Sequence, residues 1–408
     1  MPSGDGPGAG GRISGVRAAV APLRGGGRGW LLLCIAGGWL LVNGFRVLLP
    51  VLLPRIKADF AIGNAEAGFA LTVLWGLYAT LQFPGGLAAD RVGERRLVTG
   101  GLLLAASSFA AFYLAPGYAL FLAATALFGF GAGFFGTPRD MLLSRLYSSA
   151  DNTAYGITFA AGSIGSAVLP FAAAAIATRF GWRVAIVWLL PFMVVAAAGL
   201  WRLVPEREAA GLDRLPARET VSETVAALSD RRVLYGGGVM LLFIFSYQGF
   251  VAFLPTYLVE VKGLSEGLTA GLFGLMFVVG AVVNPVAGQL ADRVSERATL
   301  FALIGLSTVT LAVLPFVGGR LALAVLVPLL GIRIAIGPLT SAFIVRELPP
   351  GVQGTGWGLL RTVFFGLGAT SSSVIGVFAD AGRFDGGFLL LAGVTGLIAV
   401  FWWRVPRQ

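Results

Sequence analysis

The sequence predicts an all-α integral membrane fold with twelve transmembrane helices in two pseudo-symmetric six-helix bundles. The 408-residue chain is 57% hydrophobic and only 12% charged, whereas soluble domains carry about 25% charged residues. Its apolar runs are about 20 residues or longer, the length that a helix needs to cross roughly 30 Å of hydrocarbon. A short loop pattern also occurs twice, about half the chain length apart. Such repetition is expected of two related six-helix units.

Long apolar runs favour helices over β-barrel strands, which need only about ten residues of alternating polarity. The predicted spans are residues 30–53, 66–89, 97–115, 118–139, 154–178, 183–203, 233–259, 267–290, 298–317, 321–345, 354–379 and 384–403. The domain division that follows is a flexible cytoplasmic tail at 1–28, an N-terminal bundle at 29–203, a cytoplasmic linker at 204–232 and a C-terminal bundle at 233–408.

Charge and composition restrict both topology and function. The net charge is +10, but the arginines fall mainly in loops between spans, so they indicate topology rather than a nucleic-acid surface. Their bias places both termini in the cytoplasm, and we expect the protein in the cell inner (plasma) membrane. The chain has no histidine and one cysteine, Cys34, and it shows no buried carboxylate pair or metal cluster. We therefore expect no enzyme activity, cofactor, metal or internal disulfide.

The repeated loop follows the second and eighth spans. It reads "GGLAADRVGERR" from Gly85 and "GQLADRVSER" from Gly288. A glycine allows close helix approach, and an aspartate can face the positive N-terminal end of a neighbouring helix. The candidate gating residues are Gly86, Asp90, Arg91, Gly93 and Arg95 in the first copy, and Gly288, Asp292 and Arg293 in the second.

This loop resembles the signature of the major facilitator superfamily, and the resemblance covers about residues 30–405. It implies a monomeric transporter that works by alternating access around a central cavity. It also implies that the loop latches the two halves together on the cytoplasmic side.

Arginines inside the spans are the main functional signal. Each costs roughly 2.5–3.5 kcal/mol at the centre of a membrane helix. Arg139 has Asp140 beside it, so an interfacial or paired arginine explains it. Arg46 and Arg333 have no carboxylate at similar depth in the spans, which leaves backbone carbonyls and water, or a transported anion, as their partners. The planar fork of arginine suits a carboxylate, phosphate or sulfate. Arg361 is a weaker candidate because it lies nearer the cytoplasmic gate.

Polar side chains at membrane depth extend the predicted site because they need partners across helices or in a wet cavity. The remaining candidate residues for substrate binding are Asn43, Tyr78, Gln82, Tyr247, Gln248 and Asn284.

Short runs such as "NGFRVLLPVLLPRIKADF" and "WGLYATLQFPGGLAADR" resemble the anion:cation symporter and organophosphate antiporter branches of the superfamily. Two positions depart from the symporter pattern. Phe45 stands where an aspartate is usual, and Gly136 stands where a glutamate, the family's expected proton carrier, is usual. Symport driven by another ion, antiport and facilitated diffusion all remain open.

The sequence thus predicts a secondary active or facilitative transporter of a small organic anion, with a carboxylate favoured. Its expected partners are that anionic solute, a coupling ion and the lipid bilayer. The alternatives are an efflux transporter for drugs or other amphipathic compounds and, behind it, a non-transporting membrane sensor on the same fold.

Overall fold

The computed structural model describes residues 28–147, 151–206, 226–349 and 353–406 as a bundle of long helices. Within these residues, nine helical segments are long and apolar enough to cross a membrane. Two of them, Thr153–Leu203 and Glu266–Phe316, are 51 residues long and each contain two predicted spans. The second predicted span is absent from the nine because its helix breaks at Leu81. All twelve predicted spans therefore lie in helices, and the predicted fold class is confirmed.

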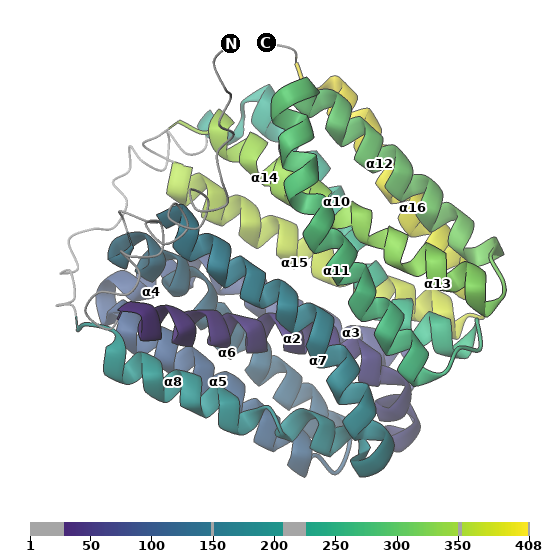
Figure 1. Ribbon diagram of the computed structural model, residues 1–408, viewed down its shortest axis with the longest axis horizontal. Coiled ribbons are helices and arrows are strands. Elements are labelled where there is room, and N and C mark those ends of the chain that lie inside the picture. Colours follow the sequence, from purple (N-terminus) through teal and green to yellow (C-terminus); the bar gives the residue numbers. More distant parts are fainter. Residues whose placement is uncertain (1–27, 148–150, 207–225, 350–352, 407–408) are drawn as a thin grey trace, which may run out of the picture.

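The helices of the first half of the chain occupy one side of the molecule (Figure 1). They are α2 (Arg28–Phe60), α3 (Asn64–Thr80), α4 (Gln82–Val92), α5 (Glu94–Leu114), α6 (Tyr118–Leu146), α7 (Asp151–Val187) and α8 (Leu190–Leu203). Gly181, with φ at 82°, bends α7 sharply, and the chain reverses there before α8.

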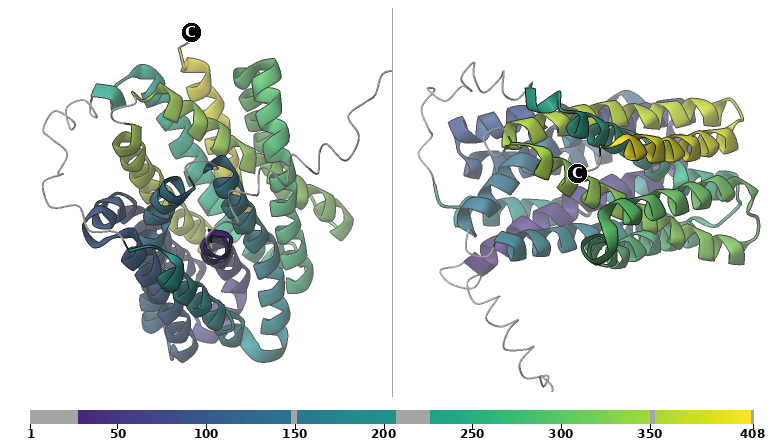
Figure 2. Two further views of the ribbon diagram at one scale, coloured as in Figure 1. Left: turned by 60° about the vertical axis from the view of Figure 1, so that its left-hand side comes forward. Right: turned by 90° about the horizontal axis from the view of Figure 1, so that it is seen from above.

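The helices of the second half occupy the other side, as the further views also show (Figure 2). They are α10 (Arg231–Glu260), α11 (Glu266–Leu290), a π-helical turn (Ala291–Ser295), α12 (Glu296–Val313), α13 (Arg320–Leu329), a 3-10 segment (Leu330–Ala335), α14 (Ile336–Glu347), α15 (Gln353–Asp380) and α16 (Phe384–Arg404). We call the end of the bundle where α2 begins and α16 ends the near end, and the opposite end the far end.

Glycines allow the two halves to approach closely. A Cβ atom on Gly68 of α3 would collide with the carbonyl oxygen of Ser372 in α15. A Cβ atom on Gly274 of α11 would likewise collide with the carbonyl oxygen of Ala167 in α7. Small residues favour tight helix packing in membranes, where no hydrophobic effect drives apolar helices together. The halves therefore meet along α3 with α15 and along α7 with α11.

Two predicted spans contain breaks. Pro84 cannot donate a backbone hydrogen bond to the carbonyl of Thr80, and the second span changes from α3 to α4 at Leu81. The tenth span passes from α13 through the 3-10 segment into α14, just after Pro328. The turn geometry of a 3-10 helix differs from that of an α-helix, so the break changes the direction in which Arg333 points.

The internal repeat is visible in a pair of matching ion pairs at the near end. Glu94, at the start of α5, pairs with Arg145 in the last turn of α6. Glu296, at the start of α12, pairs with Arg346 in the last turn of α14, with Nη2 and Oε1 2.6 Å apart. Each glutamate lies within one copy of the repeated loop, so the two halves repeat a contact as well as a sequence pattern.

The predicted tail at 1–28 lies outside the described residues except for Arg28, and so does most of the predicted linker at 204–232. The boundaries of the domain division therefore remain a prediction.

Candidate functional site

A cavity of about 140 Å³ lies between the two halves. Its lining residues come from α2, α3 and α7 of the first half and from α10, α11 and the 3-10 segment of the second. Four of the predicted binding residues are among them: Asn43, Arg46, Tyr247 and Asn284. The other lining residues are Val47, Trp75, Ser163, Ser166, Val251, Phe277, Ala281 and Ile334.

Arg46 is the only positive charge among the residues that line this cavity. Its side chain is 3% exposed, and its Nε and Nη2 atoms are buried without a hydrogen-bond partner among the described residues. Three aromatic rings surround its guanidinium carbon, at 3.7 Å from the ring centre of Tyr78, 4.9 Å from Trp75 and 5.5 Å from Trp39. Cation–π contacts stabilise such a charge partly, but they leave the Nε and Nη2 donors free for an acceptor.

The amides in the cavity wall are held in different ways. The Nδ2 atom of Asn43 donates to Ser166 Oγ at 2.9 Å and to the carbonyl of Gly162 at 3.2 Å. These bonds fix the amide orientation against α7. The Oδ1 atom of Asn284, from the opposite half, is buried without a partner in the described part of the chain. Tyr247 stacks on Phe243 with ring centres 5.6 Å apart.

Arg333 is buried but does not line this cavity, although its neighbour Ile334 does. Its Nη2 atom donates to Ser246 Oγ at 2.7 Å, and the ring centre of Phe250 lies 4.5 Å from its guanidinium carbon. Its Nε and Nη1 atoms have no partner among the described residues. Arg333 therefore faces α10 of its own half.

Two predicted glutamines also lie outside the cavity wall. Gln82, at the start of α4, donates from Nε2 to the carbonyl of Tyr78 at 3.2 Å, and its Oε1 accepts from Thr137 at 3.3 Å. These bonds join α3, α4 and α6 within one half. Gln248 is buried, and neither its Oε1 nor its Nε2 atom has a partner among the described residues.

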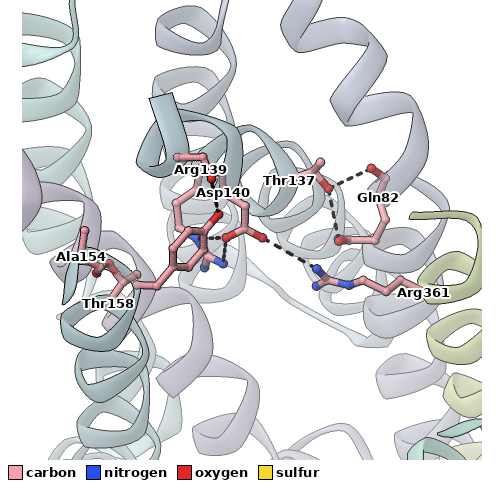
Figure 3. A network of polar contacts seen from close by, with 9 residues as sticks. Gln82, Thr137, Arg139, Asp140, Ala154, Thr158 and Arg361 are labelled. Carbon is pink, nitrogen blue, oxygen red and sulfur yellow. Dashed lines mark hydrogen bonds and ion pairs between the residues drawn. The ribbon is translucent and has the colours of Figure 1, made fainter. Parts of the chain in front are cut away.

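Arg361 takes part in a charged network that joins the halves (Figure 3). The Asp140 carboxylate lies 2.6 Å from Arg139 Nη2 in its own helix and 3.7 Å from Arg361 Nη1 in α15. Arg139 also lies over the ring of Trp39, 3.7 Å from its centre. The pairing predicted for Arg139 is thus confirmed, and Arg361 reaches the carboxylate from the opposite half, on the near-end side of Tyr78.

The positions where this chain departs from the symporter pattern are filled by other side chains. Phe45 packs against Phe109, Phe112 and Phe128 at ring-centre distances of 4.9, 5.6 and 4.3 Å. A carboxylate there would be buried among aromatic rings without a partner. Gly136 faces Gln82 and Tyr78, whose atoms would lie 3.3–3.4 Å from a Cβ atom at this position.

The repeated loops at the near end form contacts within their own halves. Arg95 lies 4.4 Å from the ring centre of Trp201 and 3.7 Å from the Glu206 carboxylate. Gly93, with φ at 91°, separates α4 from α5. Gly86 approaches Thr137 of α6, and Arg91 is exposed. The side chain of Asp90 lies outside the described residues.

In the second copy, Asp292 and Arg293 are exposed in the π-helical turn, and no atom lies within 4 Å of a Cβ placed on Gly288. Among the described side chains of the two loops, no ion pair joins the two halves. The role of these loops as a latch between the halves stays a prediction.

The far end, in contrast, is closed by charged contacts across the halves. Lys57 pairs with Glu260 at 2.8 Å, and Arg55 pairs with Glu266 at 2.5 Å. The Asp380 carboxylate, from α15, accepts hydrogen bonds from the first backbone amides of α3. The cross-half ion pairs at the far end are thus close, whereas the Asp140–Arg361 contact towards the near end is longer, at 3.7 Å.

Several lining residues were not predicted from the sequence. Ser163 and Ser166 lie one turn apart on α7, and Phe277 and Ala281 lie one turn apart on α11. The serines had a signal in the run "GSIGS", since small polar residues are enriched where membrane helices meet. Phe277 and Ala281 had none, because apolar residues are ordinary in any span.

Comparison with known proteins agrees with this architecture. Residues 34–373 match the sequence profile of the Major Facilitator Superfamily. The fold resembles a bacterial homologue of the human lysosomal transporter Spinster, solved in an inward-facing, unoccupied conformation. The TM-score is 0.79 at 14% identity, over 93% of this chain and 97% of that one.

The sequence relatives differ from one another in function. A hexuronate transporter of Bacillus subtilis is 23% identical over 54% of each chain, and a nitrite extrusion protein of the same organism is 28% identical over 55% of this chain and 56% of its own. The membrane sensor protein UhpC of Salmonella typhimurium is 25% identical over 45% of this chain and 42% of its own. Multidrug resistance proteins also match.

The chain spans only about half the length of the curated relatives it matches. The superfamily profile, however, covers most of the described helices of both halves. Membership of this family agrees with the prediction that the chain is not an enzyme. The chain is a multi-pass membrane protein that belongs to the Major Facilitator Superfamily.

Proposed function

We propose that this protein is a secondary active or facilitative transporter that moves a small organic anion, preferably a carboxylate, by alternating access. The observation that carries the proposal is Arg46. Its guanidinium lines a cavity between the halves, and two of its nitrogens are buried without an acceptor among the described residues. A carboxylate suits these nitrogens because its two oxygens can accept two parallel N–H bonds from the guanidinium fork.

The charge balance around the cavity supports an anion rather than a cation. None of the residues that line it is an aspartate or glutamate. Arg333 adds a second positive charge from the opposite half, one residue from the lining Ile334. The nearest carboxylate of the near-end network, Asp140, is already paired with Arg139. A substrate cation would meet uncompensated repulsion, whereas an anion would neutralise Arg46.

The remaining predicted residues have defined places in this proposal. Asn43 and Asn284 approach the substrate from opposite halves, and Tyr247 covers the cavity on the side of α10. Tyr78 holds the Arg46 guanidinium with its ring face. Gln248 and Gln82 lie behind the wall and become available only if their helices shift.

Cavity size favours a small solute over a drug. The cavity measures about 140 Å³, well below the roughly 300–1,000 Å³ typical of sites for drug-sized ligands. This argues against the efflux alternative in the conformation described here. A site for an anion suits a sensor as well as a transporter, and counterflow separates the two.

The proposed cycle places the near end in the cytoplasm, in keeping with the arginine-rich loops there. The far-end contacts then keep the cavity closed to the outside, and outward opening requires that they break. The chain contains no histidine, and no carboxylate lines the cavity. We therefore favour exchange of anions or facilitated diffusion over proton symport.

Counterflow in proteoliposomes tests this proposal. Vesicles containing the purified full-length protein are loaded with one unlabelled compound from a panel of mono- and dicarboxylates, phosphate esters and cationic dyes. Uptake of the same labelled compound is then measured. We expect transient accumulation with small carboxylates. Movement of cations alone, or of no member of the panel above empty vesicles, would contradict the proposal.

A further inference from the structure

A second feature, unrelated to the central cavity, lies on the membrane-facing surface between α5 and α8. It is a groove of about 540 Å³. At its near end it is lined by Arg96 and Arg202, and towards the membrane centre by Leu103 and Val194. Leu103 and Val194 are 46% and 39% exposed, so the deeper part of the groove opens to lipid.

The dimensions of the groove match one leaflet. Arg96 and Leu103 are seven residues apart on α5, which at 1.5 Å per residue is roughly 10 Å. Half of the hydrocarbon core measures about 15 Å. The groove therefore begins at the depth of phospholipid head groups and ends at the depth of acyl chains, with its polarity changing in the same direction.

The mouth of the groove carries an excess of positive charge. Arg95 and Arg96 share a single carboxylate, Glu206, at 3.7 and 3.6 Å, and the Glu206 side chain is 65% exposed. These N–O distances exceed the roughly 2.7–2.9 Å of a close, charge-assisted hydrogen bond. Arg202 has no ion-pair partner among the described residues. Three guanidinium groups thus stand against one carboxylate, which leaves the mouth attractive to an anion.

A buried hydroxyl marks the same place. Thr99, one turn into the membrane from Arg96, is only 5% exposed and lines the groove. Its Oγ1 atom has no hydrogen-bond partner in the described part of the chain. A threonine in a helix usually bonds to a carbonyl one turn earlier, and an unmade bond in an apolar setting is costly. An acceptor or donor from outside the chain would satisfy it.

The floor of the groove has room for a chain of methylene groups. No atom lies within 4 Å of a Cβ atom placed on Gly100. Ala197 and Ala198 of α8 face it from the opposite side. Small residues on both helices thus keep open a channel that larger side chains would fill.

We propose that this groove binds one anionic glycerophospholipid of the near-end leaflet. The phosphate lies between Arg96 and Arg202, a head-group or ester oxygen bonds to Thr99, and one acyl chain runs over Gly100. Basic pockets between membrane helices on the cytoplasmic side are suited to anionic head groups. The charge and the lipid-exposed apolar floor together select a lipid over a free phosphate ion.

The chain supplies a matched control. Another groove, between α2, α7 and α8, measures about 510 Å³ and has no charged residue among its lining. It contains Gly37, whose Cβ position is also open. Filling this groove with Gly37→Leu changes the lipid-facing surface in the same manner as Gly100→Leu, but away from the arginines.

Native mass spectrometry of the full-length protein in detergent measures the dissociation constant of the first bound lipid. Phosphatidylglycerol, phosphatidylcholine and glycerol 3-phosphate are titrated separately. The variants are Arg96→Gln with Arg202→Gln, Gly100→Leu, Gly37→Leu, and a charge control with Arg231→Gln and Arg404→Gln. The control removes two exposed arginines at the same end of the other half.

We expect phosphatidylglycerol to bind more tightly than phosphatidylcholine. Loss of Arg96 and Arg202 should weaken it about 30-fold, the effect of two interfacial charges. Gly100→Leu should weaken it about tenfold by displacing two methylene groups. Both controls should bind like the wild type. Equal affinity for phosphatidylcholine, unchanged binding in the groove variants, or equally tight binding of glycerol 3-phosphate without a chain would each overturn the proposal.

Discussion

The Asp380 carboxylate, in the last turn of α15, accepts hydrogen bonds from the backbone amide of Asn64 at 2.7 Å and from its side-chain amide at 3.1 Å. Asn64 begins α3 in the other half of the protein. The first amides of a helix have no partner within it, and the positive end of the helix dipole favours an anion there. A residue of one half thus caps a helix of the other and holds the far end closed.

We predict that Asp380→Asn shifts the protein towards a far-end-open state by about fivefold, because a helix terminus and a carboxylate interact by roughly 1 kcal/mol. The measurement is the distance distribution between spin labels on cysteines at Gly117 and Gly318, two open far-end positions, with Cys34 replaced. Asp385→Asn is the control, since Asp385 bonds to Tyr257 within its own half. Equal shifts in both variants would count against the cap.

A second prediction separates the two contacts of Asp140. Asp140→Asn should lower the thermal midpoint of unfolding strongly, because removal of one partner of a buried ion pair costs about 3–5 kcal/mol and Arg139 is 3% exposed. Arg361→Gln should change it little, since its 3.7 Å contact involves a side chain that is 25% exposed and such pairs contribute about 0–1 kcal/mol. Thermal unfolding followed by tryptophan fluorescence compares them, and similar losses would show that Arg361 is an equal partner.

A third prediction concerns the volume of the central cavity. Ala281→Phe should occupy the cavity and reduce carboxylate counterflow about tenfold or more, since forcing a substrate past an overpacked wall costs about 1–3 kcal/mol. Val282→Phe is the matched control because Val282 is the next residue on α11, is 62% exposed and does not line the cavity. If both variants transport like the wild type, the substrate passes elsewhere.

The sequence predicted the helices and Arg46 because both leave a signal that does not depend on packing. Length and polarity alone distinguish a membrane span from other segments. A charged side chain in hydrocarbon costs free energy at any position, so it indicates function without knowledge of the packing. Asn43 and Asn284 were predicted for the same cause. Each lies within one continuous helix, α2 or α11, and both line the cavity.

Helix breaks account for the residues that were placed less well. In one straight helix, Gln82 would lie on the same face as Trp75 and Tyr78. The break at Leu81 instead directs its side chain to Thr137 of α6. Arg333 lies in a 3-10 segment, where each residue turns further than in an α-helix, and its guanidinium reaches Ser246. Periodicity alone gives no measure of where such breaks fall.

The central claim is that the Arg46 fork binds the transported carboxylate. The most direct test is the half-saturation concentration for carboxylate counterflow in proteoliposomes with Arg46→Lys, which keeps the charge and loses the fork. Arg145→Lys is the control, since Arg145 pairs with Glu94 away from the cavity. Loss of charge-assisted bonds should raise the half-saturation concentration roughly 10- to 100-fold, with Arg333→Lys showing a smaller rise because Ser246 already holds that guanidinium. Arg46→Lys transport with the wild-type half-saturation concentration would contradict the account.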